Sequence, residues 1–150
     1  MDTRTEEAKR RVIDQAQLYL KAGLCVLFFP EGRRSGDGNV YRFSRGAFEV
    51  AIATQRPLLP VAIDGLSNLL PMNTWRFGRS GRVRMKVLAP VETRGMVAAD
   101  EERLREQVRF RIVEQVAEWR GCDPDEVDGI LRNAHLFAHE QHADEAPLLI

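Results

Sequence analysis

The fold of this chain is decided by the stretch LCVLFFPEGRRS, residues 24–35. Its first six residues are apolar and rich in Val, Leu and Phe, and they follow Gly23, which predicts a buried β-strand. Pro30 ends sheet pairing, and Gly32 permits a tight turn. The strand therefore delivers Glu31, two arginines and a serine to its carboxyl end, which is where open α/β sheets bind ligands.

The two arginines beside the glycine turn indicate an anionic ligand. The guanidinium groups of Arg33 and Arg34 can each hold a phosphate through two parallel hydrogen bonds. Farther along, Arg45 precedes a predicted helix whose free N–H groups and partial positive charge also favour an anion. Arg45 could equally be a solvated surface charge.

Three blocks of sequence resemble the 1-acylglycerol-3-phosphate acyltransferase family of glycerophospholipid acyltransferases. Residues 28–35 match that family's Phe-Pro-Glu-Gly-Thr-Arg-Ser motif, except that Arg33 replaces the usual Thr. Residues 43–48 resemble its Phe-Lys-x-Gly-Ala-Phe segment, and residues 57–63 resemble its Pro-hydrophobic-hydrophobic-Pro-Val-x-Ile motif. The blocks come in the family's order, and the resemblance fades after about residue 90.

The resemblance implies transfer of an acyl chain from a CoA or carrier-protein thioester to a lysophospholipid such as 1-acylglycerol-3-phosphate. By the same resemblance, the glycerol phosphate would be bound by the motif at residues 31–35, in which Arg33 is either a further phosphate contact or exposed. Pro60 would shape the acyl or acceptor pocket. The residues expected in the substrate site are Glu31, Gly32, Arg33, Arg34, Ser35, Arg45 and Pro60.

The family's catalytic motif, a His and an Asp separated by four residues, is absent upstream of residue 28. The chain has no histidine before His135. His139 and Asp144 have the right spacing, but they follow a polar helix end and come last, so we expect no catalytic residue in this chain. The chain is then an N-terminally truncated acyltransferase domain, inactive alone, or else a catalytically dead lipid-phosphate-binding or structural remnant of the family.

Hydrophobic periodicity predicts an α/β fold: a partial acyltransferase-like domain with a mixed sheet flanked by helices and with C-terminal helices. Helices are expected at residues 5–22, 45–55, 100–119 and 124–142, and strands at 24–29, 58–63 and 82–87. Helix 45–55, capped by Ser44, would join parallel strands as a crossover. We place an acyltransferase-like α/β domain at residues 1–95 and a helical extension packed on it at residues 96–150.

The connection at residues 66–81 has two interpretations. Its Leu, Trp and Phe residues are interrupted by Arg76 and Arg79, which suits a loop folded over the core. Aromatic and basic residues together also suit a patch at the level of lipid headgroups. In the strand that follows, Val83, Met85 and Val87 alternate with basic residues, which predicts that these three side chains face the core.

Composition excludes several classes of function. The formal net charge is zero, so there is no overall basic footprint for nucleic acid. Two cysteines are too few for a disulfide framework, and we expect Cys25 to be buried in the strand. The histidines at 135, 139 and 142 lack further ligands, so no metal is expected, and the family resemblance implies no bound organic cofactor.

The sequence also bears on location. Its longest apolar runs fall short of the ~20 residues of a transmembrane helix, and its charged first residues do not resemble a signal peptide. We therefore expect a cytoplasmic protein, peripheral to the inner face of the membrane. The expected partners are the lysophospholipid acceptor, the acyl thioester donor and the membrane surface.

Overall fold

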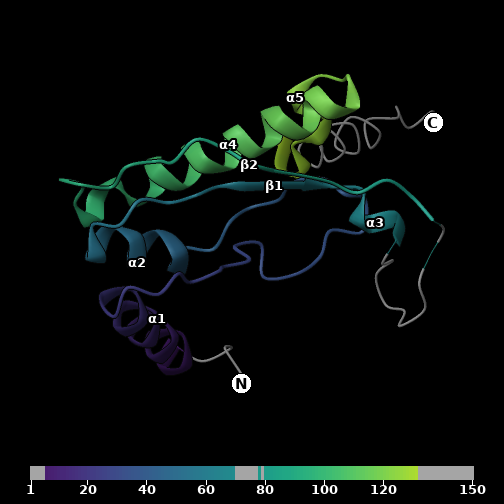
Figure 1. Ribbon diagram of the computed structural model, residues 1–150. Coiled ribbons are helices and arrows are strands. Elements are labelled where there is room, and N and C mark those ends of the chain that lie inside the picture. Colours follow the sequence, from purple (N-terminus) through teal and green to yellow (C-terminus); the bar gives the residue numbers. More distant parts are fainter. Residues whose placement is uncertain (1–5, 70–77, 79, 132–150) are drawn as a thin grey trace, which may run out of the picture.

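The computed structural model describes residues 6–69, 78 and 80–131 (Figure 1). The elements are α1 (Glu6–Lys21), α2 (Gly46–Thr54), β1 (Val61–Asp64), α3 (Leu66–Leu69), β2 (Arg84–Val87), η1 (Ala98–Asp100), α4 (Glu101–Arg120) and α5 (Pro124–Val127). Figure 1 shows α4 along one side of the β1–β2 pair, with α1 and α2 on the other side. Helix α1 packs against α2, and α4 packs against both β1 and α2.

The three longer helices confirm the predictions from periodicity. Helix α1 ends where Gly23 adopts a φ of +82°, and the N–H of Leu24 donates to the carbonyl of Tyr19 at 3.0 Å. Helix α4 ends in the same way at Gly121, whose φ is +66°. Helix α2 ends at Gln55, which takes a left-handed conformation without being glycine.

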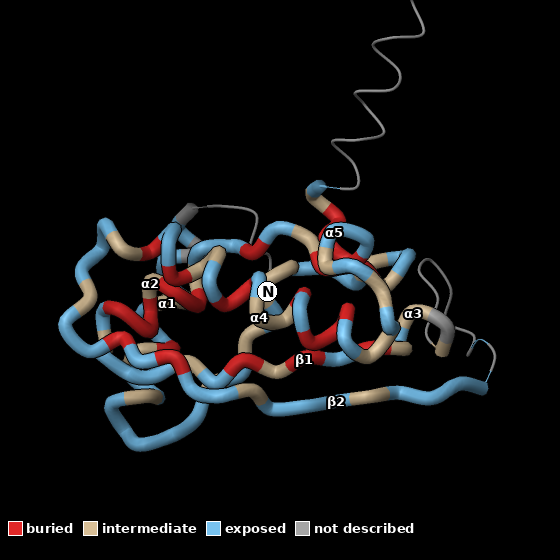
Figure 2. Tube along the Cα trace, turned by 90° about the horizontal axis from the view of Figure 1, so that it is seen from above, coloured by how far each residue is buried: buried red, intermediate tan, exposed pale blue. Residues whose placement is uncertain are grey.

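One hydrophobic cluster joins α2, β1 and α4. Phe48 and Ile52 of α2 and Ala62 of β1 pack with the buried face of α4, whose members are Leu104, Val108, Val113, Val116 and Ala117. The burial colours of Figure 2 follow the same division: buried residues gather on α2, β1 and α4, whereas β2 is largely exposed. The predicted boundary at residue 95 stays a prediction, although this cluster draws residues from both sides of it.

The sheet differs from the predicted mixed sheet. Within the described residues it has two strands, β1 and β2, paired antiparallel with Val61 opposite Val87 and Asp64 opposite Arg84. Leu58 pairs with Val91 in an isolated antiparallel bridge, and Val40 makes a parallel bridge with Asp128. The predicted parallel crossover through α2 is wrong, because no strand forms before α2 in the part of the chain that the structure describes.

The inward face of β2 is the opposite of the predicted one. Arg84 and Lys86 turn toward α4, where they donate to the carbonyl of Trp119 and to Gln115 respectively. Met85 is 70% exposed, and Val83 and Val87 are exposed as well. The alternation of apolar and basic residues correctly predicted that the strand has two different faces. The polar partners on α4 decide which of these faces turns toward that helix.

Residues 24–29 do not form the predicted buried strand. Val26 and Phe28 are half-buried, whereas Leu27 and Phe29 are each 73% exposed and Cys25 is exposed as well. The structure records no main-chain hydrogen bond between described residues for positions 25–28. An apolar segment becomes a buried strand only when neighbouring strands pair with it, and here no described strand lies against it.

Two further predictions are corrected or fall outside the described residues. Helix α5 begins at Pro124 as predicted, with Asp123 accepting from the Asp125 N–H at 3.0 Å, and it ends at Val127. Asp128 is extended and pairs with Val40, and residues 129–131 are helical again, so the predicted helix is interrupted at Asp128. The rest of the predicted helix to residue 142 lies mostly outside the described part, as does most of the 66–81 connection. No described helix combines the length and apolar composition needed to cross a membrane.

The exposure of Leu27 leads to a direct test. Replacing Leu27 with Ala should lower the free energy of unfolding by at most about 0.5 kcal/mol, as for a surface change. Replacing Phe48, which is 2% exposed, with Ala should lower the free energy of unfolding by about 3–5 kcal/mol. Urea unfolding measures both changes. A loss of about 2 kcal/mol or more in Leu27→Ala would instead show that this side chain is buried.

Candidate functional site

The motif at residues 30–35 forms a tight turn at the start of a longer loop. Gly32 has a φ of +69°, and its N–H donates to the carbonyl of Phe29 at 3.0 Å. Nothing lies near the position that a side chain at Gly32 would take. Glycine is therefore favoured here by the left-handed backbone and not by a lack of space. The turn places Glu31 and the residues after it at the start of the loop.

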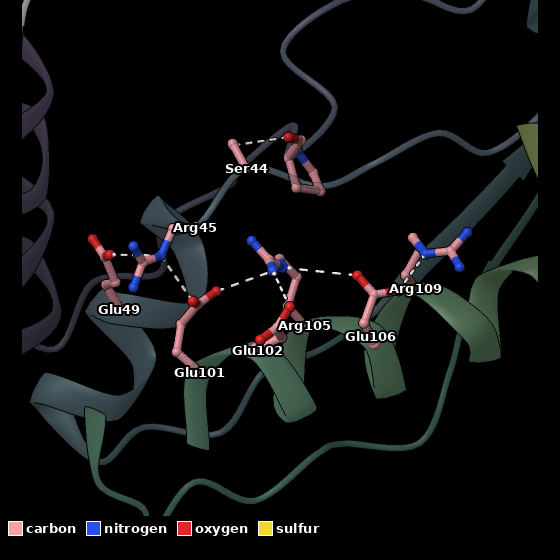
Figure 3. A network of polar contacts seen from close by, with 9 residues as sticks. Ser44, Arg45, Glu49, Glu101, Glu102, Arg105, Glu106 and Arg109 are labelled. Carbon is pink, nitrogen blue, oxygen red and sulfur yellow. Dashed lines mark hydrogen bonds and ion pairs between the residues drawn. The ribbon is translucent and has the colours of Figure 1, made fainter. Parts of the chain in front are cut away.

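The loop closes on itself at the start of α2. Both the N–H and the hydroxyl of Ser44 donate to the carbonyl of Pro30, each at 2.8 Å. Ser44 was predicted to cap α2, but the capping position is held by Arg45, and the Ser44 hydroxyl serves to close the loop (Figure 3). Two of the sequence blocks, residues 28–35 and 43–48, are therefore neighbours in space.

Glu31 is the half-buried acidic group of this loop. Its carboxylate accepts a hydrogen bond from the N–H of Tyr41 at 3.3 Å. Burial raises the pKa of Glu31 above 4.5, and the negative charge of Asp37 adds to the rise. The Tyr41 hydrogen bond and the positive charge of Arg33 lower that pKa, but burial outweighs them.

The rest of the motif lies toward the surface. Gly32, Arg33 and Arg34 are exposed, and Ser35 is half-buried. The structure therefore places two guanidinium groups on the outer side of a loop whose inner side holds Glu31. An acidic group with two neighbouring cations suits a ligand that has both a hydroxyl and a phosphate.

Arg45 is engaged by glutamates. Its Nε donates to Glu101 Oε2 at 2.8 Å and lies 3.4 Å from Glu49 Oε1, and Figure 3 shows it reaching between these two carboxylates. The hydrogen bond with Glu101 is the main cause that raises the pKa of Arg45. The site role predicted for Arg45 stays a prediction, and the positive charge on which it depends is already compensated.

Arg45 also borders an open cleft of about 380 Å³ between the starts of α2 and α4. It is lined by Arg45, Ala98, Ala99, Glu101, Glu102 and Arg105. Two guanidinium groups and two carboxylates balance there, so the cleft has no excess positive charge for a phosphate. None of residues 30–35 is among the described residues that line it.

Pro60 lies apart from the loop. It is buried just before β1, and its carbonyl accepts from the N–H of Leu88 at 2.9 Å. This contact holds the end of β2 to the start of β1. The predicted role of Pro60 in a substrate pocket is not tested by this placement.

The sequence analysis missed a polar cluster around Asp64. This carboxylate receives hydrogen bonds from Arg84 of β2 and from Arg120, the last residue of α4. Arg120 also reaches the loop at Gly38 and Asn39. The signal in the sequence was a charged residue, Asp64, at the end of a predicted strand. Its partner Arg120 lies 56 residues away, and no local pattern connects the two.

The histidines of the sequence, for which no catalytic or metal-binding role is expected, are not among the described residues. The spaced pair His139 and Asp144 falls outside them as well. Within the described ranges, no three His, Cys, Asp or Glu side chains gather closely enough to hold a metal ion.

Comparison with known proteins gives a consistent result. The acyltransferase family model matches residues 1–64. Over 110 residues the chain is 34% identical to 1-acyl-sn-glycerol-3-phosphate acyltransferase alpha of Mus musculus, which takes in 73% of this chain and 39% of the mouse protein. The corresponding protein of Homo sapiens is also 34% identical, with 73% of this chain and 38% of its own length covered. This chain thus spans about two fifths of the length of these curated relatives.

A solved structure is similar as well. The crystal structure of PlsC, the 1-acyl-sn-glycerophosphate acyltransferase of Thermotoga maritima, matches with a TM-score of 0.66 and 35% sequence identity. The match covers 73% of this chain and 44% of that one, and it supports the acyltransferase fold for the part covered. These matches confirm the resemblance that the three sequence blocks indicate, to the acyltransferases and specifically to the 1-acyl-sn-glycerol-3-phosphate acyltransferases.

Proposed function

We propose that this chain forms the acceptor-binding part of an acyltransferase of phospholipid biosynthesis. The acceptor is a lysophospholipid such as 1-acylglycerol-3-phosphate. The observation that carries this proposal is the closed loop at residues 30–44, which holds Glu31 half-buried and Arg33 and Arg34 at its surface. The relatives named 1-acyl-sn-glycerol-3-phosphate acyltransferases support the choice of acceptor.

The reaction determines what the loop must do. The acceptor hydroxyl oxygen attacks the thioester carbonyl carbon, the carbon–sulfur bond breaks, and the hydroxyl proton ends on the departing thiol. Such a step needs a base, stabilisation of the developing oxyanion and positioning of the acceptor. In our proposal the described residues supply the positioning: Arg33 and Arg34 bind the phosphate, while Glu31 accepts a hydrogen bond from the glycerol portion.

The remaining parts of the proposal concern the donor and the location. The acyl donor is a thioester of CoA or of a carrier protein, and no metal or bound organic cofactor takes part. The enzyme works at the membrane surface, because its acceptor resides there. We place it on the cytoplasmic side, peripheral to the inner face of the membrane.

A second candidate function is binding of a lipid phosphate without catalysis. It is favoured by the lack of any histidine among the described residues, since histidine is the commonest general base in proton transfer. The deciding experiment measures two quantities on purified chain 1–150. These are the binding of 1-acylglycerol-3-phosphate and acyl transfer from acyl-CoA and from acyl-carrier protein. No binding rejects both candidates, and binding without turnover is expected of both, because no catalytic residue is expected in this chain. Turnover would support the enzyme and contradict that expectation. In the absence of turnover, the coding sequence upstream of Met1 decides: an in-frame apolar strand ending in a His and an Asp separated by four residues supports the enzyme, and its absence supports the second candidate.

Arg34 tests the phosphate contact. Replacing Arg34 with Ala should weaken the binding of 1-acylglycerol-3-phosphate, because one charge-assisted hydrogen bond contributes about 1.5–3 kcal/mol, or roughly 10- to 150-fold in Kd. The matched control is Arg103→Ala on α4, whose side chain is 66% exposed and which should leave the Kd unchanged. Titration calorimetry in detergent micelles measures both. An unchanged Kd in Arg34→Ala would remove this residue from the site.

The raised pKa of Glu31 predicts a pH dependence of stability. Because its folded-state pKa lies above 4.5, the contribution of Glu31 to stability is present below pH 4.5 and is lost as the pH rises through the folded pKa. Glu31→Gln removes this loss while keeping an acceptor oxygen for the Tyr41 N–H. The free energy of unfolding of Glu31→Gln, measured as the difference from the parent chain, should therefore increase from pH 4 to pH 7.

Urea unfolding at several pH values measures this difference. The control is Glu102→Gln, whose side chain is 82% exposed on α4. If Glu31→Gln gains nothing between pH 4 and pH 7, or loses stability over that interval, burial does not govern the titration of Glu31.

A further inference from the structure

The last residue of α4 reaches back to the loop that carries the motif. Arg120 donates to Asp64 Oδ1 from Nε at 3.1 Å and from one terminal nitrogen at 2.7 Å. That same terminal nitrogen donates to the carbonyl of Gly38 at 2.7 Å, and the other donates to Asn39 Oδ1 at 3.1 Å. A single guanidinium thus joins the end of a helix, the end of β1 and the far side of the loop.

Asp64 holds this guanidinium in place. It is 8% exposed, and its other oxygen accepts from Arg84 at 2.9 Å. Burial raises the pKa of Asp64, but the hydrogen bonds and positive charges of Arg120 and Arg84 outweigh burial and leave that pKa below 3.8. A buried carboxylate between two guanidinium groups fixes the orientation of both.

The loop fits closely under Arg120. Gly38 has a φ of +76°, and a Cβ at this position would come within 2.9 Å of both the Arg120 terminal nitrogen and the Ser67 hydroxyl. Asn39 is 3% exposed. On the other side, the N–H of Val40 donates to the carbonyl of Val127 at 3.0 Å. Residues 38–40 are therefore held between α4 and α5.

Hydrogen bonds connect these held residues to Glu31. The N–H of Asn39 and the hydroxyl of Tyr41 each donate to the Asp37 carboxylate, both at 3.0 Å. The N–H of Tyr41 donates to Glu31 at 3.3 Å. Residues 38–40 are thus connected through Asp37 and Tyr41 to the Glu31 carboxylate, which lies close to the two arginines in the chain.

We propose that Arg120 is a positioning residue for the acceptor site: it anchors residues 38–40 and thereby sets the place of Glu31 and of the arginines beside it. Arg120 lies outside residues 1–64, the part that the family model matches. What the positioned loop binds rests on the proposed function, whereas the anchoring itself does not.

The test compares Arg120→Met and Arg120→Lys with the control Arg103→Met on the same helix. Amide hydrogen exchange is measured at residues 31–41 and, as an internal reference, at Val50 and Ile52 in α2. Binding of 1-acylglycerol-3-phosphate is measured alongside. In Arg120→Met the loop amides should exchange at least about tenfold faster and the Kd should rise about tenfold, because several charge-assisted hydrogen bonds are lost. The α2 amides and the control should be unchanged.

Arg120→Lys should recover only part of the effect, because a lysine keeps the charge but lacks the planar fork of donors. If Arg120→Met does not fold, Gly38→Ala serves instead, since its added Cβ would push the loop from the same guanidinium. Unchanged exchange at residues 31–41 overturns the inference, and so does an increase that is equal in α2. If the parent chain binds no acceptor, the proposed function fails, while the exchange result still decides whether Arg120 anchors the loop.

Discussion

The rest of the structure depends on one buried carboxylate, that of Asp64. It ends β1, and it receives hydrogen bonds from Arg84 of β2 and Arg120 of α4. Burying an ion costs several kcal/mol unless it is paired and fully hydrogen-bonded, and removing one partner from a buried pair typically costs 3–5 kcal/mol. The pairing therefore adds little net stability, but it excludes arrangements in which either guanidinium lies elsewhere. Sheet, helix and loop are held in register by this requirement.

The same requirement explains the unusual face of β2. Arg84 and Lys86 have partners on the α4 side, so the polar side of the strand faces that helix and the apolar side with Met85 faces away and is exposed. Leu27 and Phe29 also expose their side chains, while the residues between and before them are half-buried. In both segments the chain has the alternation of a half-buried strand. The described residues cover one side of each and leave the other side open.

Local features of the sequence predicted the local features of the fold. The period of apolar residues placed α1, α2 and α4, and glycine at the ends of α1 and α4 placed their caps. What failed depends on partners distant in the chain: no strand among the described residues pairs with residues 24–29, and the helix that begins at Pro124 is interrupted where Asp128 pairs with Val40. The site shows the same limit. A contiguous motif predicts Glu31 and Arg34 as site residues, whereas the Glu101 partner of Arg45 lies 56 residues away and no local pattern predicts it.

This division bears on how the proposed acceptor site is built. The family motif lies within residues 1–64, yet the loop that presents it is held by Arg120 and by Val127. A short motif can specify which groups contact a phosphate. A loop of Gly, Ser and Asp residues, however, has many conformations of similar free energy. The hydrogen bonds from α4 and the pairing with α5 select one of them. The chemistry of the motif and the precision of its placement therefore come from two separate parts of the sequence.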